Sequence, residues 1–154
     1  MIGDVVELTV EERPTAVIAE TTSWEEFPRL WGALLSEVWE TVRGDEEVRP
    51  GRNVMLYLDD VPHVEVGAEA AGPFESRGRV VASALPAGRV AMTRLVGSYE
   101  EIGAAHKAVV DACAERGLER LGPCWEIYGH HNDAGPDQEV EIYHLVAAQS
   151  SSGS

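Results

Sequence analysis

The sequence predicts an α+β fold in which a ββαββ unit occurs twice, giving an antiparallel sheet of about eight strands with two helices on one face. The segment Ser23–Phe27 (SWEEF) recurs 75 residues later as Ser98–Ile102 (SYEEI), which is close to half of the 154-residue chain. Each copy follows a run rich in β-branched residues and precedes two further apolar runs. The connections are short, which favours antiparallel pairing of the strands and a pseudo-twofold arrangement of the two units.

Each unit contains one amphipathic helix with the same start signal. Ser23 and Ser98 are expected N-cap residues, and a glutamate three positions later completes a capping box. Apolar side chains then recur at helical spacing. The first stripe contains Trp24, Phe27, Trp31, Leu34, Leu35, Val38 and Val42, and the second contains Tyr99, Ile102, His106, Val109, Val110 and Cys113. We expect the helices to end before Gly44 and near Gly117, where a positive φ suits glycine.

The strands are expected around these helices. In the first unit they cover residues 5–10, 15–22, 53–58 and 64–68, and in the second 78–85, 89–96, 124–128 and 140–145. Turns are expected at 50–51 and 59–62, and a longer loop at 132–138. The chain is therefore expected to form one domain over residues 1–148, with repeat one at about 4–72 and repeat two at about 78–147. Residues 149–154 are expected to form a disordered tail.

The composition excludes several classes of partner. With 12 basic and 27 acidic side chains, the net charge is −15, which repels a phosphate backbone and argues against direct nucleic-acid binding. No apolar run approaches the roughly 20 residues that cross a bilayer, and the acidic N-terminus does not resemble a secretory signal. We expect a cytoplasmic protein with no membrane partner. Cys113 and Cys124 lie in apolar segments and are expected to be reduced and buried.

Several motifs occur in an order that resembles one known family. They are Leu85–Arg89 (LPAGR), Gly97–Glu101 (GSYEE), Gly122–Tyr128 (GPCWEIY) and Glu139–Tyr143 (EVEIY), together with Tyr57–Asp60 (YLDD) and His63–Gly67 (HVEVG) in the first half. In this combination the chain resembles the GyrI-like (gyrase-inhibitor-like) family over about residues 3–147.

The resemblance implies a pseudo-twofold pair of modules with a central ligand groove. Effector domains of multidrug-sensing regulators use this groove for lipophilic, often cationic, aromatic compounds. Some relatives antagonise gyrase inhibitors or gyrase itself, and others hydrolyse cyclopropane-bearing genotoxic natural products. Because the first expected strand begins near Val5, no helix-turn-helix fits before it, and we expect a freestanding binding domain.

Glu126 is the principal candidate for the site. It lies between Trp125 and Ile127 in a short expected strand and matches the family's glutamate position. A buried carboxylate is costly to ionise unless a cation, a hydrogen-bond donor or water compensates its charge, and a cationic ligand is one such compensation. The strand pattern also leaves open a solvated glutamate on the outer face of the sheet.

Three further groove residues follow from the alternation and the repeat. Tyr128 shares a face with Glu126, whereas Trp125 and Ile127 point the other way and are expected to pack beneath the helices. Met55 and Tyr57 are the counterparts of Glu126 and Tyr128 in the first unit. Met and Tyr suit a tolerant binding surface. The alternative for both tyrosines is an ordinary strand position with a solvated hydroxyl.

The helices supply two more candidates. Trp39 extends the first stripe to its edge and is expected at the groove, whereas Trp24 and Trp31 are expected to pack in the core. His106, the counterpart of Trp31, is interpreted either as a ligand hydrogen-bond partner or as a satisfied interior histidine. The adjacent His130 and His131 with Asp133 suggest a metal site, but neighbouring strand residues point apart and no spaced third ligand follows.

No metal and no cofactor is therefore expected, since the sequence also has no phosphate loop and no nucleophile elbow. Three functions remain open. The first is binding or sequestration of lipophilic, cationic aromatic compounds through Glu126, Tyr128, Tyr57, Met55, Trp39 and His106. The second is hydrolysis of strained electrophiles, with Glu126 and Tyr128 as catalytic residues. The third is interaction of the acidic surface with gyrase or another protein.

Overall fold

The computed structural model describes residues 1–129 and 138–148 and contains the predicted ββαββ order twice. The elements are β1 (Val6–Val10), β2 (Arg13–Thr21), α1 (Phe27–Val42), β3 (Asn53–Tyr57), β4 (His63–Glu69), β5 (Val81–Leu85), β6 (Gly88–Gly97), the 3₁₀ turn η1 (Tyr99–Glu101), α2 (Ile102–Arg116), β7 (Arg120–Tyr128) and β8 (Gln138–Val146). The expected loop at 132–138, except Gln138, and the expected tail at 149–154 lie outside the described residues.

All eight strands form one antiparallel sheet, as the sequence predicts. Their order is β1-β6-β8-β7-β3-β4-β2-β5. Equivalent strands of the two units lie at equal distances from opposite edges, with β1 and β5 outermost and β7 and β3 at the centre. The units meet in the centre, where β3 pairs with β7. The first strand of each unit lies in the other half of the sheet, because β1 pairs with β6 and β5 pairs with β2.

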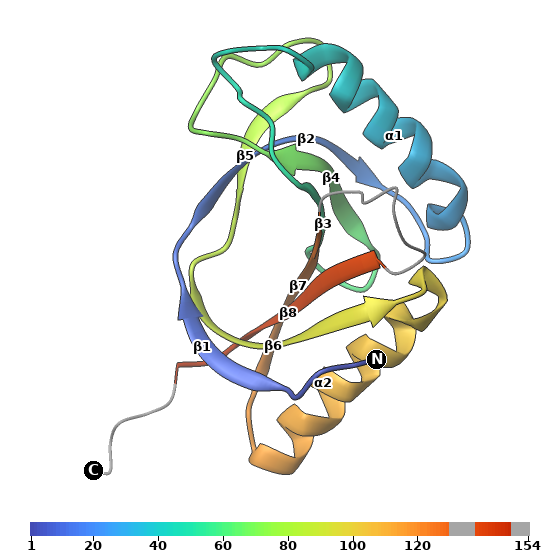
Figure 1. Ribbon diagram of the computed structural model, residues 1–154, viewed down its shortest axis with the longest axis vertical. Coiled ribbons are helices and arrows are strands. Elements are labelled where there is room, and N and C mark those ends of the chain that lie inside the picture. Colours follow the sequence, from blue (N-terminus) through green and yellow to red (C-terminus); the bar gives the residue numbers. More distant parts are fainter. Residues whose placement is uncertain (130–137, 149–154) are drawn as a thin grey trace.

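The sheet is strongly curved (Figure 1). Only residues 11–12 connect β1, at one edge, with β2, which lies next to the strand at the opposite edge. The three steps from Val10 to Arg13 span at most about 11 Å, so the two edges must approach one another. Side chains of both edge strands accordingly pack on one shared apolar cluster, through Leu8 and Val10 of β1 and Val81 and Leu85 of β5.

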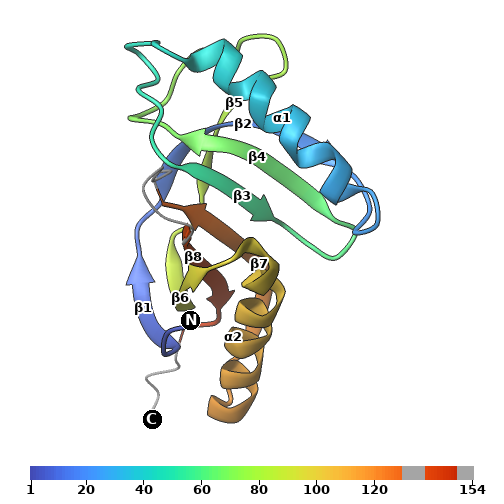
Figure 2. The same cartoon turned by 45° about the vertical axis from the view of Figure 1, so that its right-hand side comes forward.

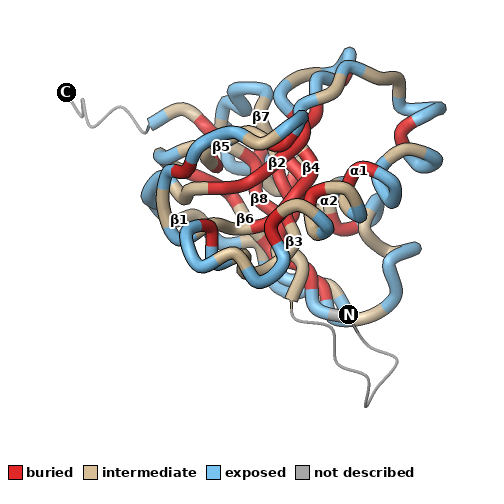
Figure 3. The backbone as a smooth tube through the Cα atoms, turned by 90° about the horizontal axis from the view of Figure 1, so that it is seen from above, coloured by how far each residue is buried: buried red, intermediate tan, exposed pale blue. Residues whose placement is uncertain are grey.

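Both helices lie on the other face of this curved sheet, with α1 on β2 and β4 and α2 on β6 and β8 (Figure 2). Buried residues concentrate in the strands, whereas the outer faces of the helices are exposed (Figure 3). The expectation that Trp125 and Ile127 pack beneath the helices is wrong. They belong to the cluster inside the curve, where Trp125 stacks on Tyr143 with ring centroids 5.5 Å apart.

The two predicted serine N-caps differ in how they precede their helices. Ser98 forms the complete capping box with Glu101, and η1 leads directly into α2. The Ser23 hydroxyl accepts a hydrogen bond from the Glu26 backbone N–H, at 3.1 Å, and a turn precedes α1, which begins at Phe27. Gly117 ends α2 with the predicted positive φ, of 69°. None of the described helices is long and apolar enough to cross a membrane.

Gly67 lies where the backbones of neighbouring strands approach closely. It lies in β4 between Val17 of β2 and Val54 of β3, and a Cβ atom placed on it would lie 1.9 Å from the Ala16 carbonyl oxygen. No side-chain rotation removes a clash with backbone, so the strands themselves would have to separate.

We therefore expect Gly67→Ala to lower the free energy of unfolding by at least about 2 kcal/mol, because overpacking is forced on a central strand. Urea unfolding followed by circular dichroism measures the change. The control is Gly32→Ala in α1, where nothing lies within 4 Å of the new methyl group and helix propensity predicts a gain of about 0.5–1 kcal/mol. Equal urea midpoints for Gly67→Ala and the wild type would contradict the packing argument.

Candidate functional site

An aromatic groove lies between the two helices, over the central strands of the sheet. Its volume is about 360 Å³, within the usual range of small-molecule sites. Helix α1 contributes one wall, η1 and the start of α2 the other, and β3 and β7 the floor. The lining residues are Phe27, Pro28, Trp31, Leu35, Asn53, Met55, Tyr57, Tyr99, Ile102, Glu126 and Tyr128.

Glu126 lies at the floor of this groove and is 3% exposed. It stands directly opposite Met55 in the β3–β7 pair, at the centre of the pseudo-symmetric sheet. Its Oε1 atom accepts hydrogen bonds from the hydroxyl groups of Tyr57, at 3.1 Å, and Tyr128. The interpretation of Glu126 as a solvated outer-face residue is therefore wrong, and Met55, Tyr57, Glu126 and Tyr128 are brought together.

The two tyrosines flank the carboxylate from the two units. Their hydroxyl oxygens also lie 3.7 Å (Tyr57) and 3.6 Å (Tyr128) from Sδ of Met55. Burial, and then the negative charge of Glu126, raise the pKa of both phenols. The hydroxyl groups consequently keep their hydrogens and donate them to the carboxylate, so neither tyrosine has the solvated hydroxyl of an ordinary strand residue.

Trp24, which precedes α1, and Trp31 in α1 are more exposed than expected. Trp31 is 37% exposed and lines the groove, and Trp24 is 50% exposed, with its ring 5.4 Å from that of Tyr57. Core packing is therefore the wrong interpretation for both. The buried face of α1 instead carries Leu34, Val38 and Val42.

Trp39 is not among the groove-lining residues, contrary to the expectation. It continues the helix row of Phe27, Trp31 and Leu35 by one more turn, which places it beyond the end of the groove. Its Nε1 donates to Oδ1 of Asn53 at 2.6 Å, and Asn53 in turn lines the groove. Trp39 is therefore placed behind a groove residue.

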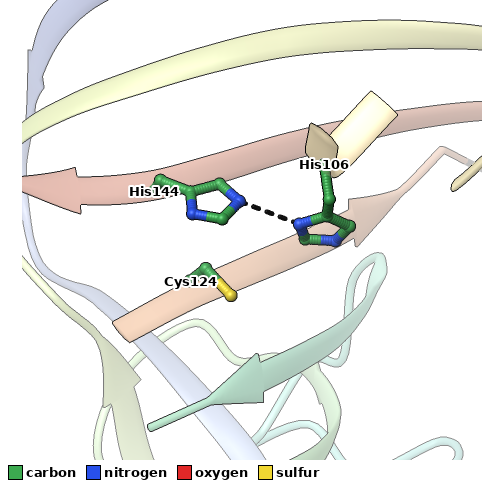
Figure 4. Close-up of side chains that lie close together, drawn as sticks. All are labelled: His106, Cys124 and His144. Carbon is green, nitrogen blue, oxygen red and sulfur yellow. Dashed lines mark hydrogen bonds between the residues drawn. The ribbon is translucent and has the colours of Figure 1, made fainter. Parts of the chain in front are cut away.

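His106 lies beside Glu126 rather than on the groove surface. Its Nε2 is 2.6 Å from Oε2 of Glu126, and its Nδ1 is 2.8 Å from Nε2 of His144 in β8 (Figure 4). His106 is thus a partly buried histidine with both ring nitrogens paired. The sequence reasoning missed His144, although its apolar strand neighbours Val140 and Ile142 share its face and mark a histidine in a buried position.

Burial fixes the charge of two neighbouring groups. Burial, and then the charge of His106, lower the pKa of His144 to about 3. Burial, and then the charge of Glu126, raise the pKa of the Cys124 thiol to about 12. His144 is therefore neutral and Cys124 is a thiol near neutral pH. Both cysteines are free, but only Cys113 is buried as expected, whereas Cys124 is partly buried.

The trio His106, Cys124 and His144 also has the composition of a metal site that the sequence reasoning did not foresee. Their ligand atoms all lie within 4.8 Å of one another, and imidazole and thiolate are ligands for zinc and copper. However, the 2.8 Å between the two ring nitrogens is hydrogen-bond length. It is shorter than the roughly 3.3 Å that separates two nitrogens on a tetrahedral zinc ion. Since burial also opposes the thiolate, the geometry fits hydrogen bonding better. The histidines of the metal interpretation rejected from sequence, His130 and His131, lie outside the described residues.

Comparison with protein families gives a match over most of the chain. The family described as GyrI-like small molecule binding domain matches residues 4–146 of the chain. No curated protein matches the sequence.

Solved structures with the same fold include two of EcmrR. The EcmrR C-terminal domain superposes with a TM-score of 0.74 at 15% identity, over 96% of this chain and 99% of that one. In the EcmrR–DNA complex the TM-score is 0.73 at 15% identity, and the match covers 93% of this chain but spans only 57% of the EcmrR chain.

Two further structures share the fold at 12% identity. SAV2435 bound to tetraphenylphosphonium has a TM-score of 0.68, with 94% of each chain covered. A hydrolase encoded by lin2189 from Listeria innocua has a TM-score of 0.59, with 93% of this chain and 91% of that chain covered. At such low identities these likenesses concern the fold alone.

The neutral state of His144 predicts how stability depends on pH. An unfolded histidine takes up a proton below about pH 6.5, whereas folded His144 does so only near pH 3. As the pH falls from roughly 6 to 4, its contribution to the free energy of unfolding should therefore decrease by about 1.4 kcal/mol per pH unit.

We expect His144→Gln, which keeps a hydrogen-bonding group beside His106, to remove this part of the pH dependence. Urea unfolding of both proteins at several pH values measures it. The stability advantage of the wild type over the variant should shrink as the pH falls. Two parallel stability curves would show that His144 does not carry the effect.

Proposed function

Because the chain belongs to the family of GyrI-like small molecule binding domains, we propose that its groove binds lipophilic cationic aromatic compounds. The observation that carries this proposal is the buried carboxylate of Glu126 on the floor of a mainly aromatic and aliphatic groove. Such a surface offers contact area to an apolar ligand and places one negative charge where water is scarce.

The groove supports a preference for cations in two ways. Aromatic rings line the groove, and their faces attract a positive charge. They include those of Trp31, Tyr57, Tyr99 and Tyr128. The charge of Glu126 is poorly hydrated, so a ligand cation beside it gains more than it would beside a surface carboxylate. Flexible Met55 beneath the ligand tolerates differences in ligand shape.

The choice of probe follows from the fold comparison. SAV2435, which shares the fold, is bound to tetraphenylphosphonium, a lipophilic aromatic cation. The same compound tests our proposal directly, and triphenylphosphine oxide serves as a neutral aromatic analogue.

Hydrolysis of strained electrophiles is the second candidate, because Glu126 lies beside two phenol hydroxyl groups within the groove. Glu126 would take a proton from water as the water oxygen bonds to a cyclopropane carbon. The breaking ring bond would pass its electron pair to a conjugated carbonyl, which accepts a proton from Tyr128. The lin2189 hydrolase shares the fold, which is compatible with such chemistry. The gyrase-interaction hypothesis stays a prediction.

We expect Glu126→Gln to weaken binding of tetraphenylphosphonium by about 10- to 100-fold, because the variant removes the charge and keeps the shape. Binding of triphenylphosphine oxide should change less than about threefold. Isothermal titration calorimetry measures both affinities. The control is Glu65→Gln, which neutralises a half-buried strand carboxylate outside the groove. Equal losses for the two probes would refute charge complementarity.

Product analysis separates the two candidates. Incubation with a cyclopropane-bearing alkylator, followed by mass spectrometry, should show no water adduct if the groove only binds. An adduct formed by the wild type and lost in Glu126→Gln would favour the hydrolase.

The tryptophans of α1 provide an independent test of where the ligand lies. Trp31→Ala should weaken both the cationic and the neutral probe by about tenfold, because it removes contact area regardless of ligand charge. Trp39→Ala should have a smaller effect, since Trp39 does not line the groove and is hydrogen-bonded to Asn53, which does. A larger loss for Trp39→Ala than for Trp31→Ala would move the binding site away from the groove described above.

A further inference from the structure

The hydrogen-bond chain behind the groove continues past the tyrosines. His106 connects Oε2 of Glu126, at 2.6 Å, with Nε2 of His144, at 2.8 Å. The Glu126 side chain is 4% exposed and the His106 side chain 21% exposed. Figure 4 shows the two imidazole rings with their nitrogens facing each other. The carboxylate that faces the groove therefore has a titratable group directly behind it.

The hydrogen-bond chain from Glu126 through His106 to His144 can hold one additional proton without losing a hydrogen bond. While Glu126 is a carboxylate, Nε2 of His106 must carry a hydrogen and donate it. If His106 is neutral, its Nδ1 accepts from Nε2–H of His144. If His106 is an imidazolium, its Nδ1–H donates to Nε2 of His144, whose own hydrogen then lies on Nδ1. Only the tautomer of His144 changes between these two states.

Within the described part of the chain, the surroundings leave His106 and Glu126 as the groups that exchange this proton. The other titratable or charged groups that act among the described residues are Tyr57 on β3, Tyr99 in η1, Cys124, Tyr128 and Arg120 on β7, His144 on β8, and Asp60 in the β3–β4 turn. The phenols of Tyr57 and Tyr128 and the thiol keep their hydrogens, His144 stays neutral, and arginine keeps its charge. Lys107 on α2 pairs with Asp111 at the exposed surface instead.

We propose that protonated His106 is the internal counter-ion of Glu126, and that a cationic ligand entering the groove displaces this proton. The proposal rests on the proposed function of the groove. With the site empty, the imidazolium compensates the buried carboxylate. A ligand cation beside Glu126 takes over that compensation and repels the imidazolium, so His106 releases its proton to solvent. A neutral ligand leaves the ion pair intact, and the site accommodates either ligand charge.

The linkage has a definite sign. Because binding releases a proton, the Kd for a cation should fall as the pH rises, by up to about tenfold per pH unit while His106 is protonated in the empty site. The Kd for a neutral ligand should not follow this trend.

Calorimetry at about pH 6.5 measures the released proton directly. Tetraphenylphosphonium is titrated into the wild type in phosphate and in ACES, two buffers whose ionisation enthalpies differ. The difference in binding enthalpy should correspond to release of at least about half a proton per ligand. Triphenylphosphine oxide should show no difference between the buffers. His63→Gln is the matched control, because His63 also lies 2.5 Å from a carboxylate, that of Asp59, but at the exposed surface outside the groove.

His106→Gln should abolish the release and flatten the pH dependence. Imidazole nitrogen spectra of the wild type provide the second measurement, since they report the protonation of His106 itself. The His106 signals should change from the imidazolium pattern to the neutral Nε2–H pattern when tetraphenylphosphonium binds.

The outcomes distinguish this proposal from the one on which it rests. If tetraphenylphosphonium does not bind the wild type, both proposals fail. Binding without proton release, or with His106 spectra that do not change, overturns the role of His106 alone and leaves the groove as a cation site. Release that persists in His106→Gln, together with unchanged wild-type His106 spectra, assigns the proton to another group and also overturns the proposal.

Discussion

The pairing of β3 with β7 is the constraint on which the site depends. It joins the two units and sets Met55 opposite Glu126 at the centre of the sheet. The tyrosine that follows two residues later in each unit then points to the same side, and each helix follows the strands of its own unit. A slip of one residue in this register would point the Glu126 side chain toward the apolar cluster inside the curved sheet. The groove, its charge and its two aromatic walls therefore follow from one strand pair.

That arrangement has an energetic cost, which the surrounding network offsets. A carboxylate that is 3% exposed has lost most of its hydration, and two hydroxyl groups and an imidazole replace the lost water. Beneath it, the stacked rings of Trp125 and Tyr143 support the floor from the other face of the sheet. The fold thus keeps an acidic group at a place where an apolar residue would pack with less cost, as is common at functional sites.

Local sequence patterns were sufficient to predict the repeat, the eight strands, the two helices and the meeting of Met55 with Glu126. They could not show which face of β7 meets the helices, because alternation defines two faces and the curvature of the whole sheet decides how each is covered. Trp31 and Trp39 lie in one helix row, and only the position of Asn53 under that row separates a wall residue from one beyond the groove. The contact between His106 and His144 likewise depends on a helix crossing a distant strand, which no short-range pattern encodes.

The exchange of first strands between the units has a consequence for synthesis on the ribosome. Val6 pairs with Met92, so the N-terminal strand emerges long before its partner has been translated. The first unit also obtains its outer strand from Val81–Leu85, which belongs to the second. Neither half can complete its share of hydrogen bonds alone, and the nascent first unit leaves the ribosome with open edges. Its escape from aggregation then depends on how quickly the second half follows, which makes translation speed a determinant of yield for this topology.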